Sequence, residues 1–279
     1  MKKLGVIGNG FVGSAIIHGF VLHSDNIFIH DANPKKSTHS LDEVVKSSDI
    51  IFLCLPTPMS AETGKIDLSI TDKVLDGIDQ LDFNRREKIF IIKSTVVPGT
   101  TSRYAKKYPD LAFVFNPEFL TERRARLDFI NTARIVLGGD RMFTSMLEEV
   151  YRVRFPHTPI IKTDFETAEL IKYMCNCFFA TKVSFMNEMQ QICKAIGGNW
   201  DVAVGGFISD GRIGNSHIDV PGHDGKMGFG GKCFPKDLNA MIEKAYEVGV
   251  DPVVLKAAWE KNIEVREFQD WLEIEGAVS

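Results

Sequence analysis

The sequence predicts an α/β protein in which a doubly wound parallel sheet is followed by an all-helical domain built on one long helix. Three observations predict this class. Short apolar runs alternate with helix-length segments through the first half of the chain, as in parallel strands covered by helices on both faces. The first of these runs leads into a glycine-rich turn. After residue 163, apolar residues recur with helical spacing over about thirty residues, far more than in an average helix.

Length and composition support two soluble domains. At roughly 150 residues per domain, 279 residues predict two, and 44% apolar with 25% charged residues is typical of a chain with a sizeable core. The formal charge of −4, with both signs scattered, excludes a basic surface for nucleic acid or anionic membrane. Five irregularly spaced cysteines suit a reducing compartment better than a disulfide framework, so we expect a cytoplasmic protein.

The first residues permit a different interpretation. Residues 4–22 carry no formal charge and follow two lysines, a pattern that also occurs in signal peptides and short membrane spans. Asn9, His18 and five glycines lie inside the segment, and no small-residue cleavage site follows it. A strand, a turn and a helix account for all of these residues, so we expect a buried core segment.

The expected strands of the first domain are short. They are Leu4–Ile7, Ile27–His30, Ile50–Leu55, Ile89–Ile92, Ala112–Phe115, Ile135–Leu137 and Pro159–Ile161. With the helices between them, they predict a first domain over residues 1–162.

The second domain is expected over residues 163–279. Thr163–Glu166 has the form of a capping box, and the helix that it opens is expected to run to Ile196. Gly205–Gly231 has little periodicity and predicts a folded loop region. Two further helices are expected, Lys236–Val248 and another that starts at Asp251-Pro252 and ends near Arg266.

The glycine-rich turn predicts a dinucleotide site of Rossmann type. Gly8-Asn9-Gly10-Phe11-Val12-Gly13 joins the first strand to a helix, and Asp31 ends the second strand about twenty residues later. The glycines permit a tight turn and close approach of a pyrophosphate, which the helix N-terminus stabilises. Asp31 would accept from both ribose hydroxyls and repel the extra phosphate of NADP, although Lys35 and Lys36 soften that repulsion. NAD is therefore the expected cofactor; a turn that packs without ligand is the alternative.

Three polar segments follow expected strands. They are Pro56-Thr57-Pro58, Ser94-Thr95-Val96 and Asn116–Glu122. Ligands bind at the carboxyl edge of an open parallel sheet, but a polar loop without ligand fits the first two segments equally well. In the third, Glu118 and Glu122 are candidates for a general base. The alternative is the first turn of a helix, where acids favour the dipole.

The long helix carries a lysine in an apolar stretch. Lys172 and Asn176 are one turn apart and share a face, from which they can donate to a developing oxyanion. The alternative, favoured by spacing alone, is a lysine that extends along the helix surface into solvent. Cys175 and Cys177 point apart and are expected to be core thiols rather than a metal pair; no metal site is expected.

Cys233 is the cysteine with a chemical mechanism. It lies in Gly228–Asp237, a glycine-rich loop that leads into a helix with Pro235 and Asp237 in its first residues. A helix N-terminus and the flanking lysines 232 and 236 favour thiolate over thiol, so Cys233 is a candidate nucleophile. A buried inert cysteine is the alternative.

Taken together, the motifs resemble a known family. In order along the chain they are Gly8–Gly13, Ser94–Thr101, Asn116–Leu120, Ala168–Glu188, Arg212–Gly214 and Gly228–Asp237. This set is similar to the UDP-glucose 6-dehydrogenase group of the UDP-glucose/GDP-mannose dehydrogenase family, and the resemblance covers nearly the whole chain. The alternatives left open are a sister dehydrogenase for GDP-mannose or an N-acetylated UDP-sugar, and a non-catalytic NAD-binding assembly protein.

The resemblance implies a four-electron oxidation of the sugar C6 alcohol to a carboxylate, with two NAD in turn. By this similarity Cys233 attacks the aldehyde-level intermediate and carries a thioester. Glu118 transfers protons while Asp237 and Thr95 hold the hydrolytic water, and Lys172 with Asn176 stabilises the oxyanion. UDP-glucuronate would be the product.

The resemblance also implies binding roles. The implied NAD contacts beyond the glycine-rich turn and Asp31 are Leu55, Pro56, Thr57, Ser94, Thr95, Glu122 and Lys236. The implied substrate contacts are Glu118, Phe119, Leu120, Glu122, Lys172, Asn176, Arg212, Phe229 and Gly230. Arg212 would reach the substrate of a neighbouring subunit, so the expected partner is a second copy bound through the long helix.

The chain departs from the family pattern in three places. Arg123-Arg124 follows Glu122 where the family usually has glycine; these cations either bind substrate phosphate or face solvent. The loop 215–226 is long and carries His217 and His223, for which a solvated loop is the simpler interpretation. The family normally adds a second α/β domain that holds the nucleotide, whereas this sequence stops at Ser279. We therefore expect a short form with weak substrate binding or a nucleotide clamp supplied by another chain.

Overall fold

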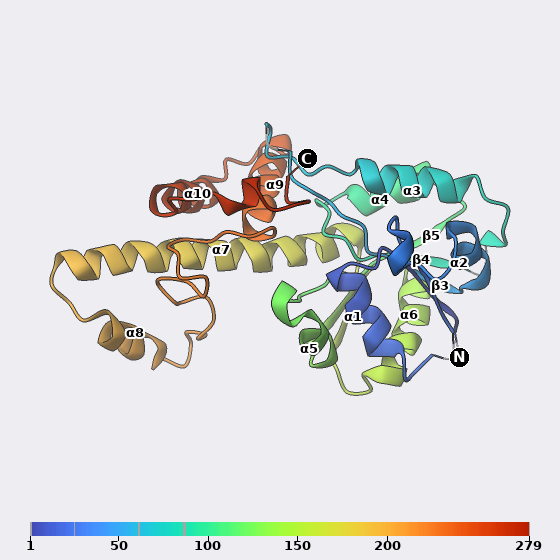
Figure 1. Cartoon of the computed structure of the whole chain (residues 1–279), viewed down its shortest axis with the longest axis horizontal. Helices are drawn as coiled ribbons and strands as arrows, with labels where there is room; N and C mark the ends of the chain where they lie inside the picture. Colours follow the sequence, from blue (N-terminus) through green and yellow to red (C-terminus); the bar gives the residue numbers. More distant parts are fainter. Residues whose placement is uncertain (1, 25, 61, 86–87, 279) are drawn as a thin grey trace. The chain divides into compact units, whose positions relative to one another are not determined.

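The computed structural model describes residues 2–24, 26–60, 62–85 and 88–278 (Figure 1). The chain forms two compact units. The first contains Met1–Thr57 and Leu68–Lys172, and the second contains Pro58–Asp67 and Tyr173–Ser279. The domain boundary expected after residue 162 stays a prediction.

The first unit alternates strands with helices. Its elements are β1 (Leu4–Ile7), α1 (Phe11–Phe20), β2 (Ile27–His30), the 3-10 turn η1 (Pro34–Lys36), α2 (Leu41–Ser47), β3 (Ile50–Leu53), α3 (Ser69–Asp79), β4 (Ile89–Ile92), α4 (Thr100–Lys107), β5 (Ala112–Phe115), η3 (Glu122–Arg124), α5 (Ala125–Ile130), β6 (Ile135–Gly138), α6 (Arg141–Arg154), β7 (Ile160–Thr163) and the first turns of α7 (Phe165–Ala195). The predicted α/β class with a long following helix is confirmed.

The seven strands form one sheet in the order β2-β1-β3-β4-β5-β6-β7. Every neighbouring pair is parallel except β5 and β6, which run antiparallel and pair only at Phe115 and Gly138. The sheet is therefore mostly, rather than wholly, parallel. The carboxyl end of β5 has little backbone support on its β6 side.

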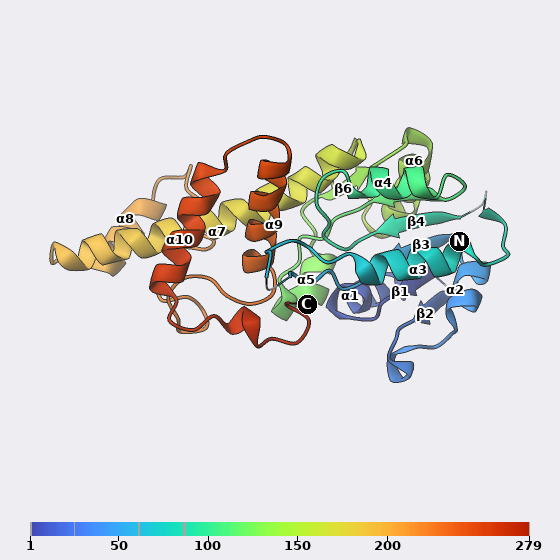
Figure 2. The ribbon, with the colours of Figure 1, turned by 90° about the horizontal axis from the view of Figure 1, so that it is seen from above.

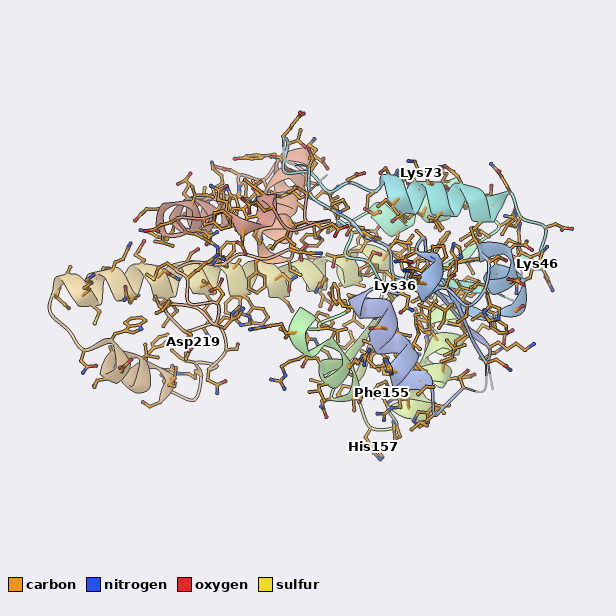
Figure 3. All side chains as sticks on the ribbon, viewed as in Figure 1. Lys36, Lys46, Lys73, Phe155, His157 and Asp219 are labelled. Carbon is orange, nitrogen blue, oxygen red and sulfur yellow. The ribbon has the colours of Figure 1, made fainter. Side chains whose placement is uncertain are left out.

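Two apolar layers cover the two faces of this sheet. Because successive residues of a strand point to opposite faces, Ile50 and Phe52 of β3 join the layer under α1, α5 and α6, whereas Ile51 and Leu53 join the layer under α2, α3 and α4. Figure 1 shows these two groups of helices on either side of the strands. Lys46 and Lys73, on α2 and α3, are exposed and point away from the sheet (Figure 3). Burial on both faces explains why the strands are continuous apolar runs.

The second unit is helical. It holds the rest of α7, α8 (Trp200–Ile208), α9 (Phe234–Glu247), α10 (Val253–Val265) and the turn η4 (Asp270–Leu272). α9 and α10 pack against each other (Figures 1 and 2). The segment Pro58–Asp67 also belongs to this unit, because Met59 packs with Trp271 and Ala277 and its N–H donates to the Ala277 carbonyl at 3.0 Å. The sequence patterns do not predict that Pro58–Asp67 belongs to the second unit.

Several predicted boundaries were wrong. Thr163 ends β7, and the cap of α7 is Asp164, whose carboxylate accepts from the N–H of Thr167 at 2.7 Å. α8 extends to Ile208 and so into the stretch from Gly205 that was expected to be a loop; its apolar residues pack with Met186 despite two glycines. Pro252 precedes α10 instead of occupying its first turn. Among the described residues, no helix is long and apolar enough to cross a membrane.

Candidate active site

The glycine-rich turn has the geometry that a dinucleotide requires. Gly8 has a φ of +95°, and a Cβ there would lie 2.4 Å from the Cys54 carbonyl oxygen; one on Gly13 would lie 2.0 Å from the Gly8 carbonyl oxygen. Both positions therefore need glycine. Gly10, in contrast, has open space around it and begins α1 without a side-chain cap among the described residues. The first N–H groups of α1 thus face a place where a pyrophosphate fits.

Asp31 reaches this turn, as predicted. Its carboxylate accepts from the N–H of Asn9 at 2.7 Å and from the N–H of Asn33 at 2.8 Å. The Asn9 amide in turn donates to the Lys36 carbonyl at 2.9 Å, so η1 lies beside the start of α1 (Figure 3). A carboxylate offers about four acceptor positions, and two remain for ribose hydroxyls. These residues fit NAD.

The loops after β3 and β4 are joined at the same edge of the sheet. The Ser94 hydroxyl lies 2.9 Å from the N–H of Leu55 and donates to its carbonyl at 2.7 Å. The Thr57 hydroxyl donates to the carbonyl of Thr95 at 3.0 Å. Pro56, between them, is exposed. The structure therefore brings together the predicted cofactor residues of these two loops.

Glu118 and Lys172 form a buried ion pair. Lys172 Nζ lies 3.0 Å from Glu118 Oε1, and the two side chains are 4% and 9% exposed. The N–H of Leu120 donates to Glu118 Oε2 at 2.5 Å. Glu118 lies in an irregular loop, so the helix-turn interpretation was wrong for it; the surface-lysine interpretation of Lys172 was also wrong. The cost of desolvating both charges is met by their pairing.

The neighbours of Glu118 are positioned by cations. Phe119 has the Arg134 guanidinium 3.9 Å from its ring centroid and Lys172 Nζ at 5.7 Å. Glu122 begins η3, and its side chain lies outside the described part of the structure. Arg123 and Arg124 are exposed, and both interpretations of these cations stay predictions.

Asp237 is the centre of a second charged cluster, in the second unit. It is 1% exposed. Its carboxylate accepts from Asn176 Nδ2 at 2.5 Å and pairs with Lys236 Nζ at 2.5 Å. α9 starts at Phe234, three residues before Asp237, rather than at Lys236 as predicted. Cys233 is the residue before this helix and is half-buried. Cys233 therefore lies one helical turn from a buried carboxylate.

The glycine loop before Cys233 is held by side chains that sequence reasoning missed. Asn262 accepts from the N–H of Phe229 at 2.7 Å and donates to its carbonyl at 3.0 Å. Arg266 pairs with Asp270 at 3.0 Å, and a Cβ on Gly230 would lie 2.2 Å from both side chains. Phe229 itself is buried. These three side chains hold the loop, and the buried Asn262 on α10 is the signal in the sequence that could have indicated it.

Other predicted residues of the second unit lie at its surface. The Arg212 side chain is 89% exposed and pairs with Asp210 at 2.5 Å. His223 is exposed, as the solvated-loop interpretation expected. His217 is exposed as well; its ring stacks on Phe179 with 4.2 Å between ring centroids, and partial desolvation lowers its pKa. Cys177 is buried as expected, but Cys175 is only half-buried.

In the first unit, three buried polar residues were missed. Lys93, Tyr151 and Glu169 are each at most 3% exposed. Glu169 accepts from the N–H of Gly99 at 2.6 Å and from Thr101 at 2.8 Å, which caps α4. Burial raises the pKa of Glu169 to about 7. Within the described ranges, no three His, Cys, Asp or Glu side chains gather in a way that could hold a metal ion.

The Rossmann-type sheet, the open glycine turn with Asp31 and the buried polar clusters define a dinucleotide-binding protein with a second, helical unit. Two family profiles match the chain. Residues 36–154 match the NAD binding domain of the UDP-glucose/GDP-mannose dehydrogenase family, and residues 166–264 match its central domain. The chain belongs to this family, and its first unit is an NAD-binding domain.

Named relatives agree with this assignment. The chain is 30% identical to UDP-glucose 6-dehydrogenase TuaD of Bacillus subtilis, over 94% of this chain and 63% of TuaD. It is 31% identical to UDP-glucose 6-dehydrogenase AglM of Haloferax volcanii, over 93% of this chain and 69% of AglM. A solved UDP-glucose dehydrogenase from Pyrobaculum islandicum superposes with a TM-score of 0.84 at 28% identity, over 95% of this chain and 68% of that one. The chain thus spans about 63% of the length of TuaD.

Proposed function

We propose that this chain catalyses the NAD-dependent oxidation of UDP-glucose to UDP-glucuronate through a covalent thioester. The observation that carries the proposal is Cys233 at the start of α9, one turn before the buried Asp237. A thiol beside a helix N-terminus is activated as a nucleophile. The names of the two relatives TuaD and AglM support UDP-glucose as the substrate.

The proposed reaction has two oxidations and one hydrolysis. NAD, when bound, accepts one hydride in each oxidation. In the first, the C6 alcohol loses a hydride and a proton and becomes an aldehyde. The Cys233 thiolate then bonds to C6 as the C=O double bond opens to a thiohemiacetal oxyanion, and loss of a second hydride from C6 re-forms the C=O bond and gives a thioester. Water adds to C6, the carbon–sulfur bond breaks, and the carboxylate leaves with the thiolate restored.

The polar residues of the motifs have proposed tasks in this reaction. Glu118 takes and returns protons. Its buried ion pair with Lys172 supports proton transfer at the Glu118 carboxylate. Lys172 and Asn176 donate to the oxyanion on C6. Thr95 and Asp237 hold the water for hydrolysis. Glu122 and Lys236 contribute to the nicotinamide side.

Substrate contacts are proposed from the same motifs. Phe119, Leu120, Phe229 and Gly230 line the sugar, and the exposed Arg212 reaches the substrate of a second copy. The NAD contacts of Leu55, Pro56, Thr57 and Ser94 follow from their place after β3 and β4.

A homodimer through α7 belongs to the proposal. In the second unit, α7 carries exposed apolar side chains at Met174, Phe178, Phe185, Met189 and Ile192. At 100° per residue these positions fall within about 60° of one another and form one stripe. Such a stripe supports an interface with a second copy, which the sedimentation mass of the pure chain tests. The odd number and irregular spacing of the five cysteines support a cytoplasmic location.

The test follows NADH formation with a panel of nucleotide sugars. We expect about two NADH per UDP-glucose; oxidation of GDP-mannose or of an N-acetylated UDP-sugar instead would move the chain to a sister activity. Cys233→Ser should bind NAD as the wild type does and release no acid. Cys193→Ser, which alters another half-buried thiol, is the control and should keep full turnover. Equal acid release by wild type and Cys233→Ser would exclude the thioester.

A further inference from the structure

Lys93 is a buried cation for which the proposed chemistry has no task. It directly follows β4 and is 3% exposed. Its Nζ donates to Asn116 Oδ1 at 3.0 Å and to the Pro117 carbonyl at 3.2 Å. These two acceptors are the residues immediately before Glu118. A single ammonium group therefore binds the chain just before the carboxylate assigned to proton transfer.

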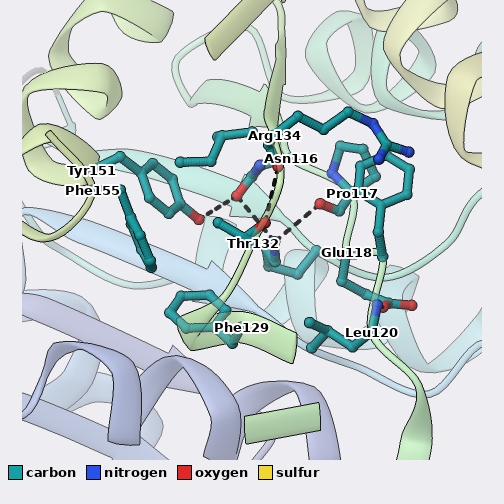
Figure 4. A pocket seen from close by; sticks show the side chains of 12 residues that line it. Asn116, Pro117, Glu118, Leu120, Phe129, Thr132, Arg134, Tyr151 and Phe155 are labelled. Carbon is teal, nitrogen blue, oxygen red and sulfur yellow. Dashed lines mark hydrogen bonds between the residues drawn. The ribbon is translucent and has the colours of Figure 1, made fainter. Parts of the chain in front are cut away.

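Asn116 is held from two more directions. The Tyr151 hydroxyl, on α6, donates to Asn116 Oδ1 at 2.5 Å (Figure 4). Asn116 Nδ2 donates to the Val136 carbonyl at 2.8 Å. The backbone pairing of β5 with β6 is confined to Phe115 and Gly138. Beyond Phe115 the side chain of Asn116 takes the place of further strand pairing on that side. The clamp of Lys93 and Tyr151 on this one side chain therefore sets where the loop to Glu118 begins.

The space beside the clamp is too small for a substrate. Figure 4 shows the cavity that Lys93, Asn116, Glu118 and Tyr151 help to line. It measures about 20 Å³, room for roughly one water molecule. Lys93 therefore acts on the reaction through the loop and not by touching a sugar or a nicotinamide.

The charges around Lys93 support the same role. Burial lowers the pKa of Lys93 to about 8, and the facing groups are the Cys54 thiol, the Glu118 carboxylate and the Lys172 ammonium, with Tyr151 beyond Asn116. Burial raises the pKa of Cys54 to about 12, so this thiol stays neutral. Below pH 8 Lys93 therefore carries its charge near the Glu118–Lys172 ion pair.

We propose that Lys93 is the positioning residue of Glu118: by clamping Asn116 and Pro117 it holds the carboxylate beside Lys172 in the place that proton transfer requires. The inference rests on the proposed function for its reaction and on the described contacts for its geometry.

The chain contains a matched control at the other end of the same strand. Lys88 directly precedes β4, is 7% exposed, and its Nζ donates to the carbonyls of Lys46 at 2.9 Å and Ser48 at 2.7 Å. Lys88→Met and Lys93→Met therefore remove the same group from the same strand. Only the second removal frees the loop before Glu118.

The experiment compares wild type, Lys93→Met and Lys88→Met. We expect Lys93→Met to lower kcat about ten- to hundredfold with the KM of the sugar changed less than about threefold, because a displaced carboxylate weakens the chemical step more than binding. Lys88→Met should keep kcat within about twofold. Because the clamp weakens when Lys93 loses its proton, the ratio of wild-type to Lys93→Met kcat should shrink as the pH rises through about 8.

Hydrogen exchange supplies a readout that needs no activity. Lys93→Met should speed amide exchange across residues 116–121, and Lys88→Met should leave that segment unchanged. The inference is overturned if Lys93→Met matches Lys88→Met both in kcat and in exchange over 116–121. Absence of turnover in the wild type with every nucleotide sugar would instead overturn the proposed function and leave the exchange result to decide this inference.

A second variant covers the case in which Lys93→Met does not fold. Tyr151→Phe deletes only the hydroxyl that donates to Asn116. It should lower kcat in the same direction by a smaller factor and speed exchange over the same segment. Wild-type kcat together with wild-type exchange in this variant would remove the clamp as the explanation.

Discussion

The two ends of β4 carry the same residue type at similar burial and use it differently. At the amino end, Lys88 donates to the carbonyls of Lys46 and Ser48, where α2 finishes, and so satisfies groups that a helix C-terminus leaves open. At the carboxyl end, Lys93 faces Glu118 and Lys172 and holds a loop. Ligands bind at the edge of the sheet where parallel strands end. A buried cation at that edge can therefore act on the chemistry, whereas one at the opposite edge stabilises the fold.

The largest expected effect comes from replacing an acidic residue at each edge of the sheet. Glu118→Gln should lower kcat about a hundredfold or more, the range that loss of a general base produces. The control is Asp49→Asn at the opposite edge, where the Asp49 carboxylate accepts from the N–H of Lys3 at 2.8 Å. Steady-state NADH formation measures both. If the two variants lost activity equally, the chemistry would not be confined to the carboxyl edge.

The next effect concerns stability at the carboxyl edge. The pKa of Lys93 is lowered from 10.5 to about 8, so between these values the unfolded chain binds more protons and stability rises with pH. The shift corresponds to about 3 kcal/mol. Denaturant unfolding of wild type and Lys93→Met at several pH values should therefore show the wild type gaining relative to the variant above pH 8. A constant difference in unfolding free energy would contradict the buried charge.

The smallest of these effects concerns Glu169, a buried carboxylate that satisfies one end of a helix as Lys88 does. Glu169 caps the start of α4 as Lys88 closes the end of α2. Glu169→Gln places an amide N–H₂ against backbone donors and should cost about 1–3 kcal/mol. Because the folded-state pKa is raised to about 7, the contribution of Glu169 falls as the pH rises from 4.5 through 7. Thermal unfolding at two pH values should show the gap between wild type and variant narrowing at the higher pH.

Much of the fold could be predicted because its signals are local. A side chain on Gly13 is excluded by the carbonyl of Gly8 in the same turn, Gly8 has a φ of +95°, and the strands are continuous apolar runs. α8 could not be predicted in this way, because only packing on Met186 outweighs its glycines. The exchange of Pro58–Asp67 into the second unit likewise depends on contacts with residues near Ala277.

The candidate site was predictable in its members and not in its pairings. Lys172 was singled out as an unusual lysine, but its partner Glu118 is 54 residues away in sequence. Lys93 precedes Ser94 at the end of a strand, where a lysine is ordinarily solvated, so the sequence gives no reason to expect it in the site. Its acceptors arrive from the loop after β5, and only the folded sheet brings that loop to it.

By itself the sequence determined the class of fold, the dinucleotide turn and the residue types available for chemistry, since turn geometry and strand burial act over a few neighbouring residues. The tertiary structure decided which of those residues are buried and which charged groups pair with one another. It turned Lys172 from a candidate surface lysine into a partner of Glu118, and Lys93 from an unremarked residue into the clamp behind it. The physical reason is desolvation: a charge taken out of water must find a partner, and the fold determines which partner is within reach.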